Sequence, residues 1–201
     1  MTNLERSGFR VKHNIKDELQ GALVFIGALW VVFLVTLVVP SLKSYGLVPR
    51  DLSGSLGILT MPFLHSGVAH LVGNTLPLLA LLLLLAGSRA NSWRIVAGTA
   101  VLGGLLLWLF GRTANHIGAS GLVFGLVAFL IASGVLEKRL VPLLITVIVG
   151  FLFGGTLLSG VLPTAGPEVS WDGHLFGAIA GVAMAYGLVA GQRRRLAVAE
   201  R

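Results

Sequence analysis

Cysteine is absent from this 201-residue sequence, and charged residues are scarce. The missing thiols exclude disulfides, thiolate catalysis and cysteine metal sites. Charged residues make up 11% of the chain and hydrophobic residues 55%, whereas about 25% of a soluble domain is charged. Together with a mean hydropathy of +0.90, this composition excludes a disordered chain, a coiled coil and an ordinary soluble enzyme. It indicates a polytopic membrane protein.

Six apolar runs are long enough to cross a bilayer, which takes about 20 residues. We place them at Gly21–Pro40, Val68–Ala86, Trp93–Phe110, Ala119–Leu136, Leu140–Leu162 and His174–Gly191. The first run lacks the small-residue cleavage site of a signal peptide, so we expect a retained signal anchor. Because no Pro/Ser linker or long charged block divides the runs, we expect one domain, residues 21–191. An N-terminal segment (1–20) and a basic tail (192–201) flank it.

Basic residues are distributed unevenly between the two sides that six spans create. One side holds Arg6, Arg10, Lys12, Lys16, Arg89, Arg94, Lys138, Arg139, Arg193, Arg194, Arg195 and Arg201. The other side holds Lys43, Arg50 and Arg112. Because basic loops stay in the cytoplasm, we expect both termini there, and a bacterial inner membrane since no organelle-targeting feature is present. Topology and anionic lipid then account for the net charge of +7, and nucleic acid is not an expected partner.

Acidic residues are missing from the six predicted spans, although the chain contains eight. Aspartyl intramembrane proteases, which need two buried Asp, are therefore excluded, and carboxylate-driven transport lacks its usual ligands. No Glu stands beside a His, so the HExxH pair of a metalloprotease is missing as well.

Four polar side chains remain within or at the start of the spans: His70, Asn74, Ser120 and His174. Their three spans all run inward from the outer side, so the four residues should lie at similar depth in the outer part of the membrane. His70 and Asn74 share a helix face, and His65 is expected in the loop at the mouth. A polar residue in lipid is a functional hypothesis. Taken singly, each also fits interhelical hydrogen bonding or a structural histidine.

Ser120 lies in the sequence Gly118-Ala119-Ser120-Gly121, at a predicted helix start. A lone GxSG is weak evidence, because Gly and Ser are common where helices pack closely. The N–H groups at a helix start are unpaired, however, and would stabilise an oxyanion formed beside Ser120. Phe124, one turn later, could stack on an imidazole.

Two GxxxG pairs occupy the fourth and sixth spans: Gly121 with Gly125, and Gly177 with Gly181. Such small-residue faces let two helices approach backbone to backbone. The second pair shares a helix face with His174, so contact between the pairs would bring His174 to Ser120. A serine hydroxyl needs such a base to become a nucleophile. General helix packing also explains the glycines, and both interpretations can hold.

Taken together, these residues resemble the rhomboid family of intramembrane serine proteases. The matching pieces are His65-x4-His70-x3-Asn74, Gly118-Ala119-Ser120-Gly121 and His174-Leu175-Phe176-Gly177-x3-Gly181, in family order across about residues 20–191. The resemblance implies an all-α membrane protein with a six-transmembrane-helix rhomboid-like bundle.

The same resemblance implies roles for particular residues. Ser120 would be the nucleophile and His174 the general base, with no buried Asp to orient it and hence a dyad. His70, Asn74 and the backbone N–H of Ser120 would bind the oxyanion, and Phe124 takes the place of an aromatic that stacks on the catalytic histidine. Membrane-anchored proteins would be the substrates. We expect neither cofactor nor metal.

The chain departs from the family pattern at two places. The loop at about Ser41–Leu64 lacks a Trp-Arg pair that many members carry, which leaves its conformation and lipid contacts open. Phe124 replaces a Tyr found in some relatives. The segment Leu162–Gly173, rich in Pro and Gly, is expected to form a mobile cap over an outward-open cavity.

Three alternatives stay open from the sequence. The first is a catalytically silent rhomboid-like protein that binds and escorts membrane clients, although the whole Ser/His/His/Asn set is present. The second is a small transporter or channel, against which the lack of charged pathway residues argues. The third is a metal site of His65, His70 and His174, which the five-residue spacing of the first two disfavours.

Overall fold

The computed structural model describes residues 14–89, 92–166 and 169–199, and long helices dominate these ranges. Six helices are long and apolar enough to cross a membrane: α1 (Ile15–Val38), α3 (Val68–Ser88), α4 (Ser92–Phe110), α5 (Ser120–Glu137), α6 (Leu140–Gly160) and α7 (Trp171–Ala199). Within the described ranges no strand is present. The predicted six-helix, all-α membrane bundle is therefore confirmed. Most of the predicted N-terminal segment, residues 1–13, lies outside the described residues.

Four helices are longer than the apolar runs that predicted them, and α1 and α7 differ from their runs the most. α1 begins at Ile15 because the side chain of Asn14 caps it, accepting from the Lys16 N–H at 3.2 Å. α7 begins at Trp171 and continues to Ala199, through most of the predicted separate tail. The residues after Gly191 include good helix formers and no proline, so nothing stops the helix at the membrane boundary.

The helices include acidic residues that lie outside the predicted apolar runs. Asp17, Glu18, Glu137 and Asp172 all lie within the long apolar helices, each close to a helix end. Three of them have polar partners there: Glu18 accepts from Ser92, Glu137 pairs with Arg89, and Asp172 accepts from Arg112. The apolar runs did not include these residues because the helices extend beyond the apolar part of the sequence.

α5 is the central helix of the bundle. In an apolar 18-residue stretch of α5, 61% is buried, whereas the corresponding share is 22% in α1 and 6% in α6. Leu126 and Phe129 of α5 are fully buried in the main core, together with Leu71 and Leu78 of α3. Because α5 is enclosed by its neighbours, its first residue, Ser120, has a position fixed by packing from several sides.

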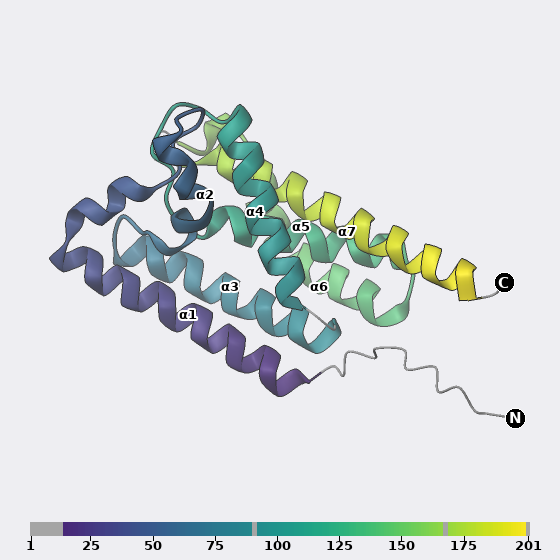
Figure 1. Ribbon diagram of the computed structural model, residues 1–201. Helices are drawn as coiled ribbons and strands as arrows, with labels where there is room; N and C mark the ends of the chain where they lie inside the picture. The colour runs from purple at the N-terminus through teal and green to yellow at the C-terminus, as the bar shows by residue number, and fades with distance from the viewer. Residues whose placement is uncertain (1–13, 90–91, 167–168, 200–201) are drawn as a thin grey trace, which may run out of the picture.

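The two ends of the bundle differ in what they hold. α1 starts and α7 stops at the same end, which we call the terminal end (Figure 1). α5 starts at the opposite end, which we call the site end because Ser120 opens that helix. The chain from α1 to α3 also folds at the site end, as η1 (Pro40–Tyr45), η2 (Ser53–Leu56), α2 (Gly57–Thr60) and η3 (Met61–Phe63).

The chain between α1 and α3 is anchored to the loop that precedes Ser120. Leu47, fully buried, forms an isolated antiparallel bridge with His116, with N···O distances of 2.9 and 2.8 Å. The Trp108 indole N–H donates to the Asp51 carbonyl at 3.0 Å, and the Arg50 N–H donates to the Trp108 carbonyl at 3.0 Å. Contacts to the end of α4 and to the loop before Ser120 thus hold this segment in place.

Candidate active site

Ser120 and His174 are in direct contact at the site end of the bundle. The Ser120 Oγ lies 2.8 Å from His174 Nε2. Ser120 opens α5 and is half-buried, whereas His174 lies in the first turn of α7 and is 8% exposed. The chain thus brings a hydroxyl and an imidazole together from residues 54 positions apart.

The other nitrogen of His174 fixes the protonation state of the ring. Nδ1 lies 2.9 Å from the carbonyl oxygen of Gly160. A carbonyl only accepts, so Nδ1 must carry the proton and Nε2 is left as the acceptor for the Ser120 hydroxyl. Gly160 is the last residue of α6, where carbonyls lack partners within the helix and are free to bind side chains.

Phe124 holds the plane of the His174 ring. The two rings stack with centroids 4.0 Å apart and an interplanar angle of 10°. A side chain on Gly160 would collide with the Phe124 ring, so that glycine makes room for the stack as well as accepting from His174. Sequence reasoning singled out Phe124 but missed Gly160, because nothing in the α6 sequence distinguishes it from the other glycines there.

Glycines bring α5 and α7 into backbone contact. A Cβ placed on Gly177 would collide with the carbonyl of Gly121, and one on Gly181 would collide with the carbonyl of Gly125. The two GxxxG pairs therefore face each other at two positions, about one helical turn apart. This close approach places the first turn of α7, which carries His174, beside the first residue of α5.

His70 approaches the same place from α3. The Ser66 Oγ lies 3.1 Å from its Nδ1, and the Ser66 N–H reaches the same nitrogen at 3.5 Å. If Nδ1 accepts, Nε2 carries a proton and is a donor. That nitrogen would be 2.6 Å from a Cβ on Gly118, a residue with φ of +116°. Gly118 is therefore required twice, for its backbone conformation and for the space that His70 fills.

Asn74 is buried behind these residues at 4% exposure. Its Nδ2 donates to the His70 carbonyl at 3.0 Å, one turn earlier in α3. An amide nitrogen carries two protons, so one donor remains. Nδ2 would be 3.6 Å from a Cβ on Gly118, which puts Asn74 near the backbone that leads to Ser120, although it does not line the cavity beside Ser120.

The sequence predicted His65 in the loop at the mouth of the site, but the structure does not expose it there. It is in the loop between η3 and α3, but its side chain is fully buried. It packs edge-on against His70 with ring centroids 5.1 Å apart, and neither ring nitrogen has a hydrogen-bond partner among the described residues. His65 therefore supports the ring of His70 by packing. No group of three His, Asp or Glu placed to hold a metal occurs in the described part of the chain.

The surroundings of His65 predict a pH dependence of stability. Burial, together with repulsion from His70, lowers the pKa of His65 from 6.5 to about 4. The unfolded chain then binds a proton at this residue below pH 6.5 and the folded chain only below about 4, so acidification between these values favours unfolding. His65→Phe keeps a ring against His70 and removes the titration. We expect a smaller fall in unfolding temperature from pH 7 to 5 for this variant, and an equal fall would contradict the assignment.

A buried carboxylate lies two residues before His174, contrary to the sequence-based expectation. Asp172 is 2% exposed and accepts from the Arg112 backbone N–H at 2.7 Å and from the Arg112 guanidinium at 3.3 Å. Its carboxylate is also 3.8 Å from His116 Nε2. The orienting contact of His174 is nevertheless with Gly160. Asp172 ties the start of α7 to the loop before Ser120, a role suited to an acid in a first helical turn.

A cavity of about 580 Å³ lies beside Ser120. Its lining includes Ser66, His70, Arg112, His116, Ser120 and His174. Val169 and Ser170, at the end of the predicted cap, also line it: the Val169 carbonyl accepts from Arg112 at 3.0 Å, and Ser170 Oγ lies 2.7 Å from His116 Nδ1. Residues 167–168 of the cap lie outside the described residues, and its motion stays a prediction.

Fold and geometry together define a helical membrane protein with a Ser–His pair beside a cavity at one end of a six-helix bundle. The family model of the Rhomboid domain matches residues 53–191. A protein of Mycobacterium tuberculosis (strain ATCC 25618 / H37Rv) is 40% identical over 187 residues, covering 88% of this chain and 77% of its own. A protein of Mycobacterium leprae (strain TN) is 44% identical over 154 residues, which cover 72% of this chain and 60% of the relative. Both are described as uncharacterised proteins. The chain belongs to the rhomboid family.

Proposed function

We propose that this protein is an intramembrane serine endopeptidase that cleaves membrane-anchored proteins within or beside their transmembrane segments. The observation that carries the proposal is the 2.8 Å contact between Ser120 Oγ and His174 Nε2, with the opposite ring nitrogen held by the Gly160 carbonyl. This is the arrangement that a serine nucleophile and its general base require. Members of the family are generally serine intramembrane proteases.

The proposed reaction proceeds through an acyl-enzyme. Ser120 Oγ attacks the scissile carbonyl while His174 Nε2 takes the hydroxyl proton, and His174 then gives this proton to the leaving amine. Water, activated in turn by His174, hydrolyses the ester and regenerates the hydroxyl. A carboxylate is not needed to hold the ring, because the Gly160 carbonyl and the Phe124 ring fix its tautomer and its plane.

The oxyanion would be held by donors from α3 and from the start of α5. The Ser120 N–H belongs to the first turn of α5, where N–H groups have no partner within the helix. The donor Nε2 of His70 faces Gly118, close to Ser120, and Asn74 has one amide proton left. These donors would gain strength as negative charge develops on the substrate oxygen.

Removing one of these side-chain donors should slow the reaction without abolishing it. Losing one oxyanion donor typically costs about 10²–10³ in rate. We expect the cleavage rate to drop by about 10² or less in His70→Ala and in Asn74→Ala, because the remaining donors and the Ser–His pair persist. Initial rates of substrate cleavage measure the effect. If both variants kept wild-type rates, α3 would serve only to pack the bundle.

The substrate and the orientation follow from the resemblance and from the charge distribution. Rhomboid-like cleavage implies a single-pass substrate with a small residue before the cut and a helix-weakening stretch after it. The basic residues of the terminal end favour a cytoplasmic location for both termini. The Ser120 cavity would then open to the outer side of a bacterial inner membrane, and residues 21–191 would form the catalytic domain.

Cleavage of a defined substrate tests the proposal directly. The purified full chain, reconstituted in liposomes with a single-pass model substrate, should produce two fragments whose masses place the cut at one position near the membrane boundary. The alternative, a catalytically silent protein that binds membrane clients, predicts retention of the intact substrate without fragments. The presence of the complete Ser120, His174, His70 and Asn74 set favours the protease.

A further inference from the structure

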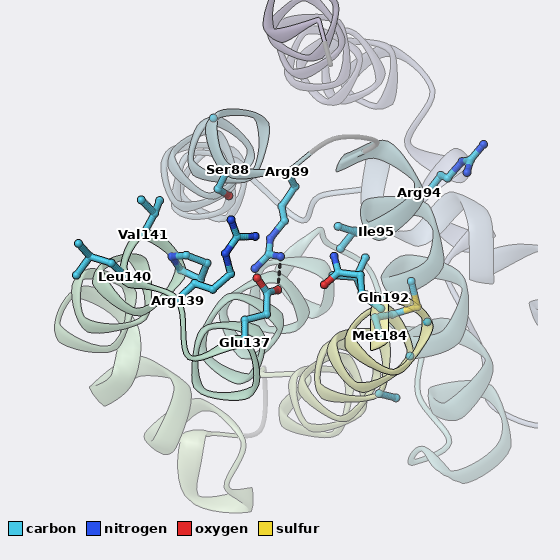
Figure 2. Close-up of a pocket in the computed structure, with 16 residues that line it drawn as sticks. Ser88, Arg89, Arg94, Ile95, Glu137, Arg139, Leu140, Val141, Met184 and Gln192 are labelled. Atoms are coloured by element: carbon cyan, nitrogen blue, oxygen red, sulfur yellow. Dashed lines mark hydrogen bonds and ion pairs between the residues drawn. The ribbon is translucent and has the colours of Figure 1, made fainter. Parts of the chain in front are cut away.

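A second cavity, of about 920 Å³, lies at the terminal end of the bundle. Its lining comes from the ends of α3 and α5, the starts of α4 and α6 and the later part of α7 (Figure 2). We call it the terminal pocket and define it by Arg89, Glu137, Arg139, Val141, Met184 and Gln192. The 18 residues of α5, about 27 Å of helix, separate the terminal pocket from the Ser120 site. The terminal pocket therefore takes no part in the proposed reaction.

A buried arginine forms the wall of this pocket. The side chain of Arg89 is 9% exposed and pairs with Glu137, whose side chain is 6% exposed. Its guanidinium also donates to Ser133 Oγ at 3.0 Å and lies over the Phe129 ring at 5.8 Å. Arg89 Nε is buried without a hydrogen-bond partner among the described residues. A guanidinium has five N–H donors, so these contacts do not use all the donors of Arg89.

Positive charge exceeds negative charge in the pocket. Arg89, Arg94 and Arg139 line it together with one carboxylate, Glu137. In Figure 2 Arg139 extends from the start of α6 toward Arg89 and Glu137, and Arg94 points away from them. The pair of Arg89 and Arg139 is thus neutralised only in part by Glu137.

The start of α6 adds unpaired backbone donors to the same pocket. Leu140 and Val141 are the first two residues of this 21-residue helix, and both line the pocket. Their N–H groups precede the first intrahelical hydrogen bond, in which the Leu143 N–H donates to the Arg139 carbonyl at 3.0 Å. Helix N-termini bind phosphate through such groups and through the helix dipole. The arginines and the helix start therefore favour the same kind of anion.

Much of the remaining lining is apolar and borders the outer surface of the bundle. Ile95, Met184 and Leu188 line the pocket, and the side chains of Leu140 and Val141 are 72% and 60% exposed on the outside of α6. A ligand that fits this lining has an anionic group for the arginines and an apolar part for the surface of α6. Anionic phospholipids have both, and basic pockets between transmembrane helices bind their headgroups.

We propose that the terminal pocket binds a phosphate group, carried by an anionic phospholipid whose headgroup reaches Arg89, Arg139 and the start of α6. Gln192, which in Figure 2 points toward the same space, supplies an amide for the headgroup hydroxyls. A bound lipid would join α3, α6 and α7 at the end of the bundle opposite Ser120. This inference does not depend on the proposed protease activity.

Short-chain lipids added to the purified full chain in nonionic detergent test this site. Dihexanoyl phosphatidylglycerol should raise the unfolding temperature in a saturable manner, and dihexanoyl phosphatidylcholine should not. Arg139→Gln should increase the half-saturating concentration about fivefold, since one basic residue near a lipid headgroup contributes about 1 kcal/mol. Arg139→Lys keeps the charge but loses the bidentate donor geometry, so it should increase the half-saturating concentration less. This variant replaces Arg139→Gln in the test if Arg139→Gln does not fold.

Lys138→Gln is the matched control. It removes the same charge one residue away, at an exposed position that does not line the pocket, and should change the half-saturating concentration less than twofold. If it weakened binding as much as Arg139→Gln, the effect would be diffuse surface attraction and the pocket would be wrong. Equal responses to both lipids would overturn the proposal too. Saturable stabilisation by inorganic phosphate alone, weakened by Arg139→Gln, would support the phosphate site and assign its ligand to a soluble phosphate.

Discussion

Replacing Ser120 with alanine is expected to abolish cleavage of a transmembrane model substrate, by at least about 10³-fold. The change removes the only atom that would form the acyl-enzyme. It removes little packing, because Ser120 is half-buried and its Oγ contacts His174 across the start of a helix. Expression and unfolding temperature should therefore stay close to wild type. The measurement is the initial cleavage rate in liposomes, with the variant and wild type at equal protein density.

His174→Ala should cause a loss of the same order, since the hydroxyl of Ser120 is a poor nucleophile without a base. A double variant of Ser120 and His174 should be no worse than either single variant, because the two residues act as one unit. Activity within tenfold of wild type in either single variant would contradict the assignment of the pair.

Gly177→Val is expected to reduce cleavage by about 10² or more, although it removes no chemical group. A Cβ at this position collides with the Gly121 carbonyl, and backbone cannot rotate away as a side chain can. α5 and α7 must then separate, and a displacement of about 1 Å between reacting groups can cost about 10²-fold. Overpacking a tight contact costs roughly 1–3 kcal/mol, so the unfolding temperature should fall by several degrees as well.

Gly187→Val is the control for this prediction. Gly187 lies in the same helix, and a Cβ there has no atom within 4 Å. Cleavage and unfolding temperature should both remain near wild type in this variant. If Gly177→Val retained full activity, the contact between α5 and α7 would not be what places His174 beside Ser120.

The sequence predicted the parts of this structure that depend on local pattern. Hydropathy identified six spans, and the structure has six apolar helices. The GxxxG pairs predicted the contact between α5 and α7, because small residues at helical spacing have one dominant structural use in membranes. The proximity of Ser120 and His174 followed from that contact alone. In the structure Ser120 Oγ lies 2.8 Å from His174 Nε2.

What the sequence could not predict depends on partners far away in the chain. Asp172 was placed outside the spans because the predicted apolar run began at His174, yet it is buried against Arg112, 60 residues earlier. An acid just before an apolar run, together with one of the few basic residues on the same side, was the available signal for this pair. The carbonyl of Gly160 had no signal, since every residue carries a carbonyl and only the fold decides which one meets His174.

Helix ends and loop burial were the other weak points. α7 continues through the tail because helix formation, unlike hydropathy, does not stop at the last apolar residue. His65 was placed at the mouth by its distance in sequence from His70, but the loop turns its ring inward, edge-on to His70. Hydropathy locates spans along the chain but does not say which way a loop side chain points.

Site-specific labelling with a fluorophosphonate tests the central claim, a Ser120 hydroxyl activated by His174, without any knowledge of the physiological substrate. The folded wild-type chain in detergent should form one covalent adduct, and peptide mass spectrometry should place it on Ser120. His174→Ala should lose the adduct although Ser120 is retained, and Gly187→Val should keep it. Absence of labelling in folded wild-type protein, or equal labelling in His174→Ala, would contradict the account and favour a membrane-protein binder without catalytic activity.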